Sequence, residues 1–126
     1  MIRYSEQNID HNDILNVTKT LKSNLITTGP QIPKFEKNLS KKINSKYCVV
    51  FNSATSALHS ACLALGLKKN DWLWTSANSF VASANCGLFC GAKIDFIDIE
   101  LETFNLDLQK LETKLKKAKK KNYYQK

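Results

Sequence analysis

The stretch from Tyr47 to Gly66 is the part of the sequence that most restricts the fold. Residues 47–51 are apolar enough for a strand buried on both faces, and a short polar turn leads from them into a helix expected from about Ala54. Ser53 suits the N-cap of this helix, and Gly66 suits a left-handed residue at its end. A strand that turns directly into a helix is typical of phosphate-binding sites.

The start of this helix can hold an anion without a basic side chain. Backbone N–H groups in the first turn of a helix have no carbonyl partner, and the aligned peptide dipoles leave partial positive charge there. Ser53, Thr55 and Ser56 add hydroxyl groups. The small side chains of Ala54 and Ala57 let a ligand approach the backbone. The alternative is a capped core helix without a ligand, because serine and threonine caps occur on helices of every function.

Two helices and a loop are expected before this stretch. Residues 1–8 are predicted to be an extended arm, and a helix begins at Asp10 with apolar residues at a 3.6-residue period. The segment 24–33 contains Gly-Pro and a second proline, so it is predicted to be a loop. Its two threonines favour contact with a ligand or partner, and an ordinary connector is the alternative. Pro33 suits the first position of a helix that ends near Asn44.

Strand and helix alternate further along the chain. Strands are predicted at 72–75 and 93–99, with Ile94, Phe96 and Ile97 of the second strand buried. A helix from about Ser79 to Gly91 joins them, and a last helix carries Leu108, Leu111 and Leu115 on one face. Right-handed crossovers then give a parallel sheet flanked by helices.

The ends of the three strands are expected at one edge of this sheet. That arrangement brings together residues 52–55, residues 75–80 and Asp98. Open α/β sheets bind their ligands at this edge. Three parallel strands do not complete such a sheet, so we expect that much of the domain is missing.

Composition argues against a nucleic-acid binder and a membrane protein. The formal charge is +8, but residues 109–126 hold eight lysines and one glutamate, which leaves only +1 for the other 108 residues. A terminal lysine run is more often a solvated helix end than a nucleic-acid surface. No apolar run is long enough to span a membrane and residues 1–10 contain no signal-peptide core, so a cytoplasmic location is expected.

The four cysteines are expected to be small buried apolar residues. They lie in apolar surroundings without a Cys-x-x-Cys pair, and the chain has only two histidines. Cys86 and Cys90 are one helical turn apart and could share a metal ion, but two thiolates without nearby partners make a poor zinc site.

Common catalytic motifs are absent from the sequence. Neither a dinucleotide fingerprint nor a P-loop follows a strand, and His11 and His59 flank no plausible nucleophile. Asp95 and Asp98 are expected on opposite faces of their strand. An anion site at a helix start remains, with the aromatic ring of Phe80 at the next strand end. Two interpretations of Phe80 stay open: its ring could stack on a planar phosphorylated cofactor, or it could be buried in the core.

Five motifs stand in order along the chain. They are Thr27-Thr28-Gly29-Pro30 followed by Phe35-Glu36, the run from Asn52 to His59, the run from Ser79 to Asn85, Gly91-Ala92, and the run from Asp95 to Ile99. Together they resemble the N-terminal third of the DegT/DnrJ/StrS-type sugar aminotransferases, from about Tyr4 to Lys121. Within that family, the chain is most similar to the enzymes of pseudaminic acid biosynthesis.

The resemblance implies an α/β chain with the aspartate-aminotransferase-like fold type I, present as an incomplete, mostly parallel sheet flanked by helices. It implies pyridoxal 5'-phosphate (PLP) as the cofactor and a homodimer for the full-length family. Three regions follow from it: an N-terminal arm and helices at 1–44, the beginning of the PLP-binding large domain at 45–115, and a lysine-rich tail at 116–126.

The resemblance also implies site residues. The cofactor-binding set is Ser53, Ala54 and Thr55 at the phosphate and Phe80 stacked on the pyridine ring. The residues expected to line the nucleotide-sugar site are Tyr4, Asn24, Leu25, Ile26, Thr27 and Ala54.

The family reaction moves an amino group from glutamate to a keto-sugar nucleotide, here a UDP-4-keto-6-deoxy sugar. It needs a lysine that forms a Schiff base with the cofactor and an aspartate that keeps the pyridine nitrogen protonated. Family members carry both residues well beyond position 126, so this chain alone is expected to be inactive. The alternatives are a PLP-dependent sugar dehydratase of the same fold and a small non-catalytic binding module with a basic tail.

Overall fold

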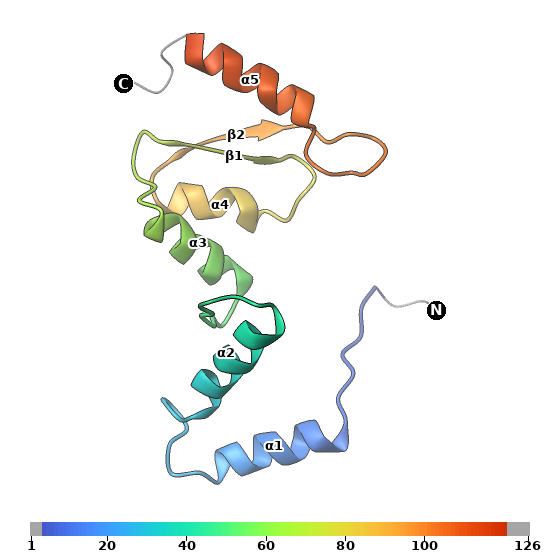
Figure 1. Ribbon diagram of the computed structural model, residues 1–126, viewed down its shortest axis with the longest axis vertical. Coiled ribbons are helices and arrows are strands. Elements are labelled where there is room, and N and C mark those ends of the chain that lie inside the picture. Colours follow the sequence, from blue (N-terminus) through green and yellow to red (C-terminus); the bar gives the residue numbers. More distant parts are fainter. Residues whose placement is uncertain (1–3, 121–126) are drawn as a thin grey trace. The chain divides into compact units, whose positions relative to one another are not determined.

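The computed structural model describes residues 4–120, and the chain divides into two compact units, one ending at Val50 and one beginning at Phe51 (Figure 1). Unit 1 contains α1 (His11–Leu21) and α2 (Gln31–Lys42). Unit 2 contains α3 (Ala54–Ala64), β1 (Trp72–Ser76), α4 (Ala82–Phe89), β2 (Lys93–Ile97) and α5 (Leu108–Lys120). The α/β class expected from the sequence is confirmed. Among residues 4–120, no helix has the length and apolar character needed to cross a bilayer.

The helices of unit 1 begin close to where the sequence predicts. Asp10 is the N-cap of α1, and the Asp10 and Asp13 side chains each accept the other's backbone N–H at 3.0 Å. This reciprocal pair satisfies two N–H groups that the helix start leaves without partners. The second helix begins at Gln31, two residues before the predicted Pro33. Proline is tolerated there because N–H groups of the first turn have no intrahelical acceptor.

The strand expected at residues 47–51 is not formed, and its expected burial is wrong. Tyr47 is 74 % exposed and Val49 is 68 % exposed. A strand needs a neighbour for its backbone groups, and none of the described residues forms a ladder with this segment. The N–H of Val50 instead donates to Glu36 Oε1 on α2 at 2.9 Å. Of the three predicted strands, two are formed within residues 4–120.

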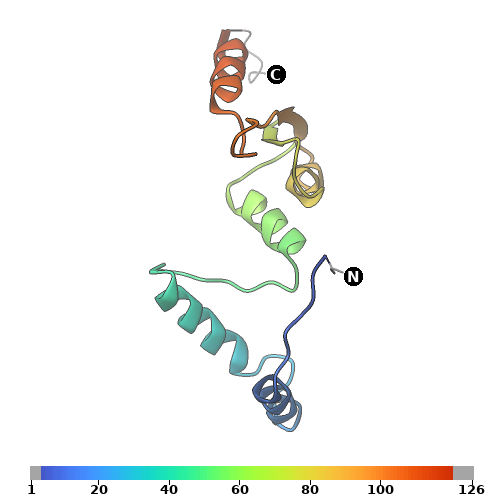
Figure 2. The ribbon, with the colours of Figure 1, turned by 90° about the vertical axis from the view of Figure 1, so that its right-hand side faces the viewer.

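β1 and β2 form a two-stranded parallel sheet in unit 2. Their register runs from Trp72 opposite Lys93 to Ser76 opposite Ile97. α4 provides the crossover and lies on one face of the sheet, whereas α5 lies on the other face (Figures 1 and 2). This arrangement agrees with the prediction of a parallel sheet flanked by helices.

α4 approaches the sheet closely at Gly87. A Cβ atom at this position would lie 2.6 Å from Ile94 Cδ1 and 3.1 Å from Leu73 Cβ.

The bounds of α4 and β2 differ slightly from the prediction. α4 begins three residues later than the predicted Ser79, and β2 ends two residues before the predicted Ile99. Phe96 of β2 stays 52 % exposed, because α4 is the one helix on its face of the sheet in the part of the chain that the structure describes. The predicted burial of Phe96 is therefore wrong.

Lys114 connects α5 to β2 on the face of the sheet opposite α4. Its ammonium nitrogen lies 2.5 Å from Asp95 Oδ2 and donates to the Phe96 carbonyl at 2.8 Å. The same nitrogen lies 5.1 Å from the centre of the Trp74 ring. The Phe96 N–H donates to Asp95 Oδ1 at 2.8 Å. The backbone N–H and C=O of Phe96 point away from β1, to the outer edge of β2. Both groups are bonded to side chains, so a further strand cannot pair with β2 at this residue.

The ion pair with Lys114 makes the attachment of α5 sensitive to acid. Hydrogen bonding to Lys114 holds the pKa of Asp95 below its ordinary value, helped by the Phe96 N–H. A carboxyl with a lowered folded-state pKa stabilises the fold above its unfolded pKa of about 4, and this stabilisation is lost as the pH falls through the folded pKa. We expect Lys114→Met to raise the pKa of Asp95, measured by NMR titration of its carboxyl carbon.

A matched lysine on the same helix provides the control. Lys116 pairs with Glu112 at 2.7 Å, and both side chains are exposed. Lys116→Met should leave the pKa of Asp95 unchanged. An unchanged Asp95 pKa in Lys114→Met would show that Lys114 does not hold this carboxylate in solution.

Candidate functional site

The start of α3 is built as the sequence predicts. Ser53 has an extended backbone and is the N-cap, and its Oγ accepts the Ser56 N–H at 3.2 Å. The Ser53 carbonyl accepts the Ala57 N–H at 3.1 Å, which closes the first turn. Among the described residues, no acceptor meets the N–H of Ala54 or Thr55. Two backbone donors at a positive helix end are therefore available to an anion.

Three hydroxyl-bearing residues lie in the same turn as these two donors. Ser53 Oγ and Ser56 Oγ lie 3.0 Å apart, and Thr55 adds a third hydroxyl in the same turn. α3 contains no charged residue, so no carboxylate of this helix competes for the N–H groups. The site offers the hydrogen-bond donors that a phosphate group requires, and the principal donors are backbone N–H groups.

Phe80 belongs to the loop between β1 and α4. Its carbonyl accepts the Ser83 N–H at 3.0 Å, and its side chain is 75 % exposed. The interpretation of Phe80 as a core residue is therefore wrong within this chain. In Figure 1, α3 and α4 both begin on the side of unit 2 at which β1 and β2 end. Stacking of a cofactor ring on Phe80 stays a prediction.

Asp98 follows the end of β2, where the sequence places it. Its carboxylate accepts Lys110 Nζ and the Ile99 N–H, each at 2.9 Å. The hydrogen bond with Lys110 holds the pKa of Asp98 below its ordinary value, and the bond from the Ile99 N–H adds to this effect. Asp98 in turn raises the pKa of Lys110. Asp98 is therefore an ionised anchor for α5.

Sequence reasoning missed the structural role of Lys110 and Lys114. Both belong to a run of lysines that is expected to be solvated, yet Lys114 pairs with Asp95 in the middle of β2, and Lys110 pairs with Asp98 just after it. A usable signal was present in the spacing. The two lysines are four residues apart, which places them on one face of their helix. Asp98 follows the end of β2, so it escapes the alternation of the strand, and both carboxylates meet α5. The expectation that Asp95 and Asp98 point to opposite faces is therefore wrong.

Apart from Ala54 at the start of α3, the residues expected to line the sugar site lie in unit 1. Tyr4 is fully exposed in the N-terminal arm, and residues 24–27 lie in the loop between α1 and α2. This loop bends tightly, because a Cβ atom at Gly29 would lie 2.2 Å from the Leu25 carbonyl oxygen. Leu25 is 57 % exposed and Ile26 is 63 % exposed, so both side chains are accessible. The roles of these residues in substrate binding stay predictions.

The cysteines are less buried than expected. Cys86 is buried, whereas Cys48, Cys62 and Cys90 are half-buried, and all four are free thiols. Burial raises the pKa of the Cys62 thiol to about 11, and the nearby Cys86 and Cys90 thiols add to this effect. Residues 4–120 contain no group of three or more His, Cys, Asp and Glu side chains suited to hold a metal ion. A protonated, packed thiol fits the interpretation of Cys62 as a small apolar residue.

Comparison with known proteins defines the class. The profile of the DegT/DnrJ/EryC1/StrS aminotransferase family matches residues 7–121, and the chain belongs to this family. A UDP-4-amino-4,6-dideoxy-N-acetyl-beta-L-altrosamine transaminase from Campylobacter jejuni subsp. jejuni serotype O:23/36 (strain 81-176) is 48 % identical over 117 residues. That match covers 93 % of this chain and 31 % of the transaminase. A second such transaminase, from serotype O:2 (strain ATCC 700819 / NCTC 11168), is 45 % identical over the same length.

A solved structure agrees with this assignment. The putative sugar aminotransferase Spr1654 from Streptococcus pneumoniae, in its PLP form, superposes with a TM-score of 0.85 at 33 % identity. The match covers 89 % of this chain and 29 % of Spr1654. The same protein was also solved in a PMP form, so the cofactor of the family is pyridoxal phosphate. The chain thus spans about a third of the length of the relatives that it matches, and its fold belongs to fold type I.

The residues at the start of α3 fit the phosphate of this cofactor. The N–H groups of Ala54 and Thr55 have no protein acceptor among the described residues, and the Ser53 and Thr55 hydroxyls adjoin them. Donors without acceptors at a helix start are the groups with which proteins commonly bind phosphate.

Proposed function

We propose that this chain forms the part of a PLP-dependent sugar aminotransferase that binds the cofactor phosphate and contacts the nucleotide-sugar substrate. In this function an amino group passes from glutamate to a keto-sugar nucleotide of the UDP-4-keto-6-deoxy class. The proposal includes a homodimer and a cytoplasmic location for the whole enzyme. Family membership and the names of the Campylobacter relatives support it.

The two free donors at the start of α3 carry the proposal. The N–H groups of Ala54 and Thr55 would hold the phosphate, with the hydroxyls of Ser53 and Thr55 as further donors. Phe80 would contact the face of the pyridine ring, because its exposed ring precedes α4 at the end of β1. Bound PLP supplies an electron sink for the substrate carbon at which the amino group is transferred.

The sugar nucleotide is proposed to contact unit 1. Tyr4 offers an exposed phenol, and residues 24–27 present exposed apolar side chains with a threonine hydroxyl. Ala54 completes the set from the start of α3.

Two of the lysines are unsuited to covalent attachment of the cofactor. That chemistry requires a neutral amine, whereas Asp98 raises the pKa of Lys110. The ammonium of Lys114 is held by Asp95 and by the Phe96 carbonyl. From the family resemblance, which places the lysine that bonds the cofactor outside the matched motifs, we propose that this chain alone does not transaminate and that it contributes binding residues to a larger site.

Phosphate recognition can be tested on the chain as it stands. We expect PLP and inorganic phosphate to shift the amide resonances of Ala54 and Thr55 in NMR titrations, because both ligands supply an acceptor for these N–H groups. Pyridoxal, which lacks the phosphate, should leave them in place. Shifts confined to lysines of α5, or equal shifts with pyridoxal, would contradict a phosphate site at the start of α3.

A further inference from the structure

Three asparagines of this chain are followed directly by serine: Asn44, Asn52 and Asn78. Asparagine is a thermolabile residue. It loses its side-chain amide when the backbone nitrogen of the next residue attacks it, and a small next residue such as serine hinders this attack little. All three asparagines and the serines that follow them are exposed. Sequence and exposure alone therefore do not distinguish the three pairs.

The backbone nitrogen of the serine is the attacking group in each pair. It bonds to Cγ of the asparagine, the Cγ–Nδ2 bond breaks, and ammonia leaves with the proton of the serine N–H. Water then opens the cyclic imide at one of its two carbonyl carbons and leaves an aspartate or an isoaspartate. No oxidant or reductant takes part. A serine N–H that is held in a backbone hydrogen bond must first give up that bond, so its hydrogen bonding determines the rate.

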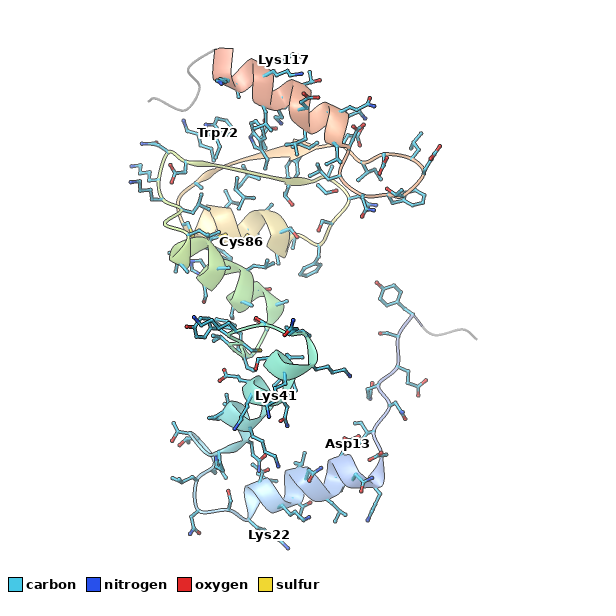
Figure 3. The ribbon with its side chains drawn as sticks, in the orientation of Figure 1. Asp13, Lys22, Lys41, Trp72, Cys86 and Lys117 are labelled. Atoms are coloured by element: carbon cyan, nitrogen blue, oxygen red, sulfur yellow. The ribbon has the colours of Figure 1, made fainter. Side chains whose placement is uncertain are left out.

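The Asn44 pair is held by hydrogen bonds at the end of α2, close to Lys41 (Figure 3). The Ser45 N–H donates to the Ser40 carbonyl at 2.9 Å. The preceding N–H, that of Asn44, donates to the Lys41 carbonyl at 3.3 Å. Asn44 itself has the left-handed backbone that is common after a helix end, with φ of 52°. Attack by the Ser45 nitrogen would break this closed turn, so the pair is protected.

The serine N–H groups of the other two pairs are available. Among residues 4–120, no acceptor meets the backbone N–H of Ser53 or Ser79. Ser53 is the N-cap of α3 and has an extended backbone. The hydroxyl of Ser79 lies 2.9 Å from Ser83 Oγ, so this contact engages the side chain and not the backbone. Asn52 and Asn78 therefore lack the protection that the first pair has.

We propose that Asn52 and Asn78 are sites of spontaneous deamidation in the folded chain, whereas Asn44 is protected by the hydrogen bonds at the end of α2. Both sites border the candidate cofactor site, because they lie one residue before the N-cap of α3 and two residues before Phe80, respectively. Deamidation of Asn52 adds a negative charge beside the start of α3, where it would repel a bound phosphate. This effect on binding rests on the proposed function, whereas the deamidation itself does not.

Peptide mass spectrometry of the incubated chain tests this selectivity. At mildly alkaline pH and moderate temperature, we expect Asn44 to convert about fivefold more slowly than Asn52 and Asn78, the factor that one retained hydrogen bond supplies. The same chain unfolded in guanidinium chloride is the control, and its three pairs should convert at similar rates because the Ser45 N–H is then free. Equal rates in the folded chain, or slow conversion of Asn44 in the unfolded chain as well, would overturn the inference.

Asn52→Asp carries the product of deamidation and tests its effect on binding. We expect this variant to bind PLP about tenfold more weakly than the original chain in equilibrium dialysis, because of charge repulsion at the start of α3. Asn70→Asp is the matched control. Asn70 is exposed in the turn beyond the other end of α3, so its variant should bind PLP like the original chain.

The two measurements separate the deamidation from its effect on binding. Equal PLP affinity of Asn52→Asp and the original chain would overturn the effect on phosphate binding. An original chain that does not bind PLP would contradict the proposed function, and the mass spectra, which need no PLP, would still decide where deamidation occurs.

Discussion

Gly87→Val is expected to lower the free energy of unfolding of unit 2 by about 3 kcal/mol. A Cβ atom at position 87 already falls 2.6 Å from Ile94 Cδ1 and 3.1 Å from Leu73 Cβ, and valine adds two methyl groups beyond it. The tip of Ile94 can turn aside, but Leu73 Cβ is fixed by its strand. α4 would have to move away from the sheet, and the few buried side chains of this unit would lose their contacts.

Tryptophan fluorescence isolates the response of unit 2. The chain has two tryptophans, Trp72 and Trp74, and both lie in β1. We expect a clearly lower urea midpoint for Gly87→Val than for the original chain. Leu88→Val is the control, because Leu88 is the exposed neighbour on α4 and its replacement should cost only a few tenths of a kcal/mol in helix propensity. Equal midpoints for the two variants would show that α4 does not approach the sheet through Gly87.

Gly87→Ala separates two opposing contributions at the same position. Alanine favours the helical state over glycine by about 1 kcal/mol. Its methyl group meets the same neighbours as the first carbon of valine, at a smaller steric cost. A small change in the free energy of unfolding for Gly87→Ala and a large decrease for Gly87→Val would therefore indicate a tight contact between helix and sheet.

Local rules were sufficient for most elements of this chain. Ser53 was recognisable as an N-cap because such a side chain bonds to neighbours in sequence, and this cap is confirmed. The helix expected to begin at Asp10 starts there, with Asp10 as its N-cap. Gly66 and Gly91 adopt the left-handed backbone that follows a helix end, with φ of 78° and 76°. β1 and β2 also follow from short apolar runs bounded by turn residues. Each of these features depends on a few adjacent residues.

Features that depend on distant partners were harder to predict. Residues 47–51 have the composition of a buried strand, but a strand exists only where another strand receives its hydrogen bonds. The prediction that Phe96 is buried was wrong for a similar reason, because α4 alone does not cover that face of the sheet. At the candidate site, the donors of Ala54 and Thr55 follow from helix geometry alone. The placement of Tyr4 and residues 24–27 at a sugar site came only from the family resemblance. For Phe80 the residues alone left stacking on a cofactor and burial in the core both open.

Thr55→Glu is expected to weaken PLP binding by about a hundredfold. The substitution places a carboxylate in the first turn of α3, beside the proposed phosphate position. At a separation of about 4 Å and partial solvent exposure, repulsion between these charges is on the order of 3 kcal/mol, which corresponds to that loss of affinity. The helix itself should tolerate the change, because a negative side chain in the first turn interacts favourably with the helix dipole. Equilibrium dialysis of PLP against the chain measures the effect.

Thr113→Glu makes the same chemical change away from the site and therefore isolates the local repulsion. Thr113 is exposed on α5, so its variant carries the same added charge without approaching α3. We expect its PLP affinity to match that of the original chain, and pyridoxal binding to be equal in all three proteins. An equal loss in both variants would mean that PLP responds only to net charge, as it would if it bound the lysines of α5. Unchanged affinity in Thr55→Glu would remove the start of α3 as the phosphate site, because a ligand held by the Ala54 and Thr55 N–H groups cannot ignore a charge added there.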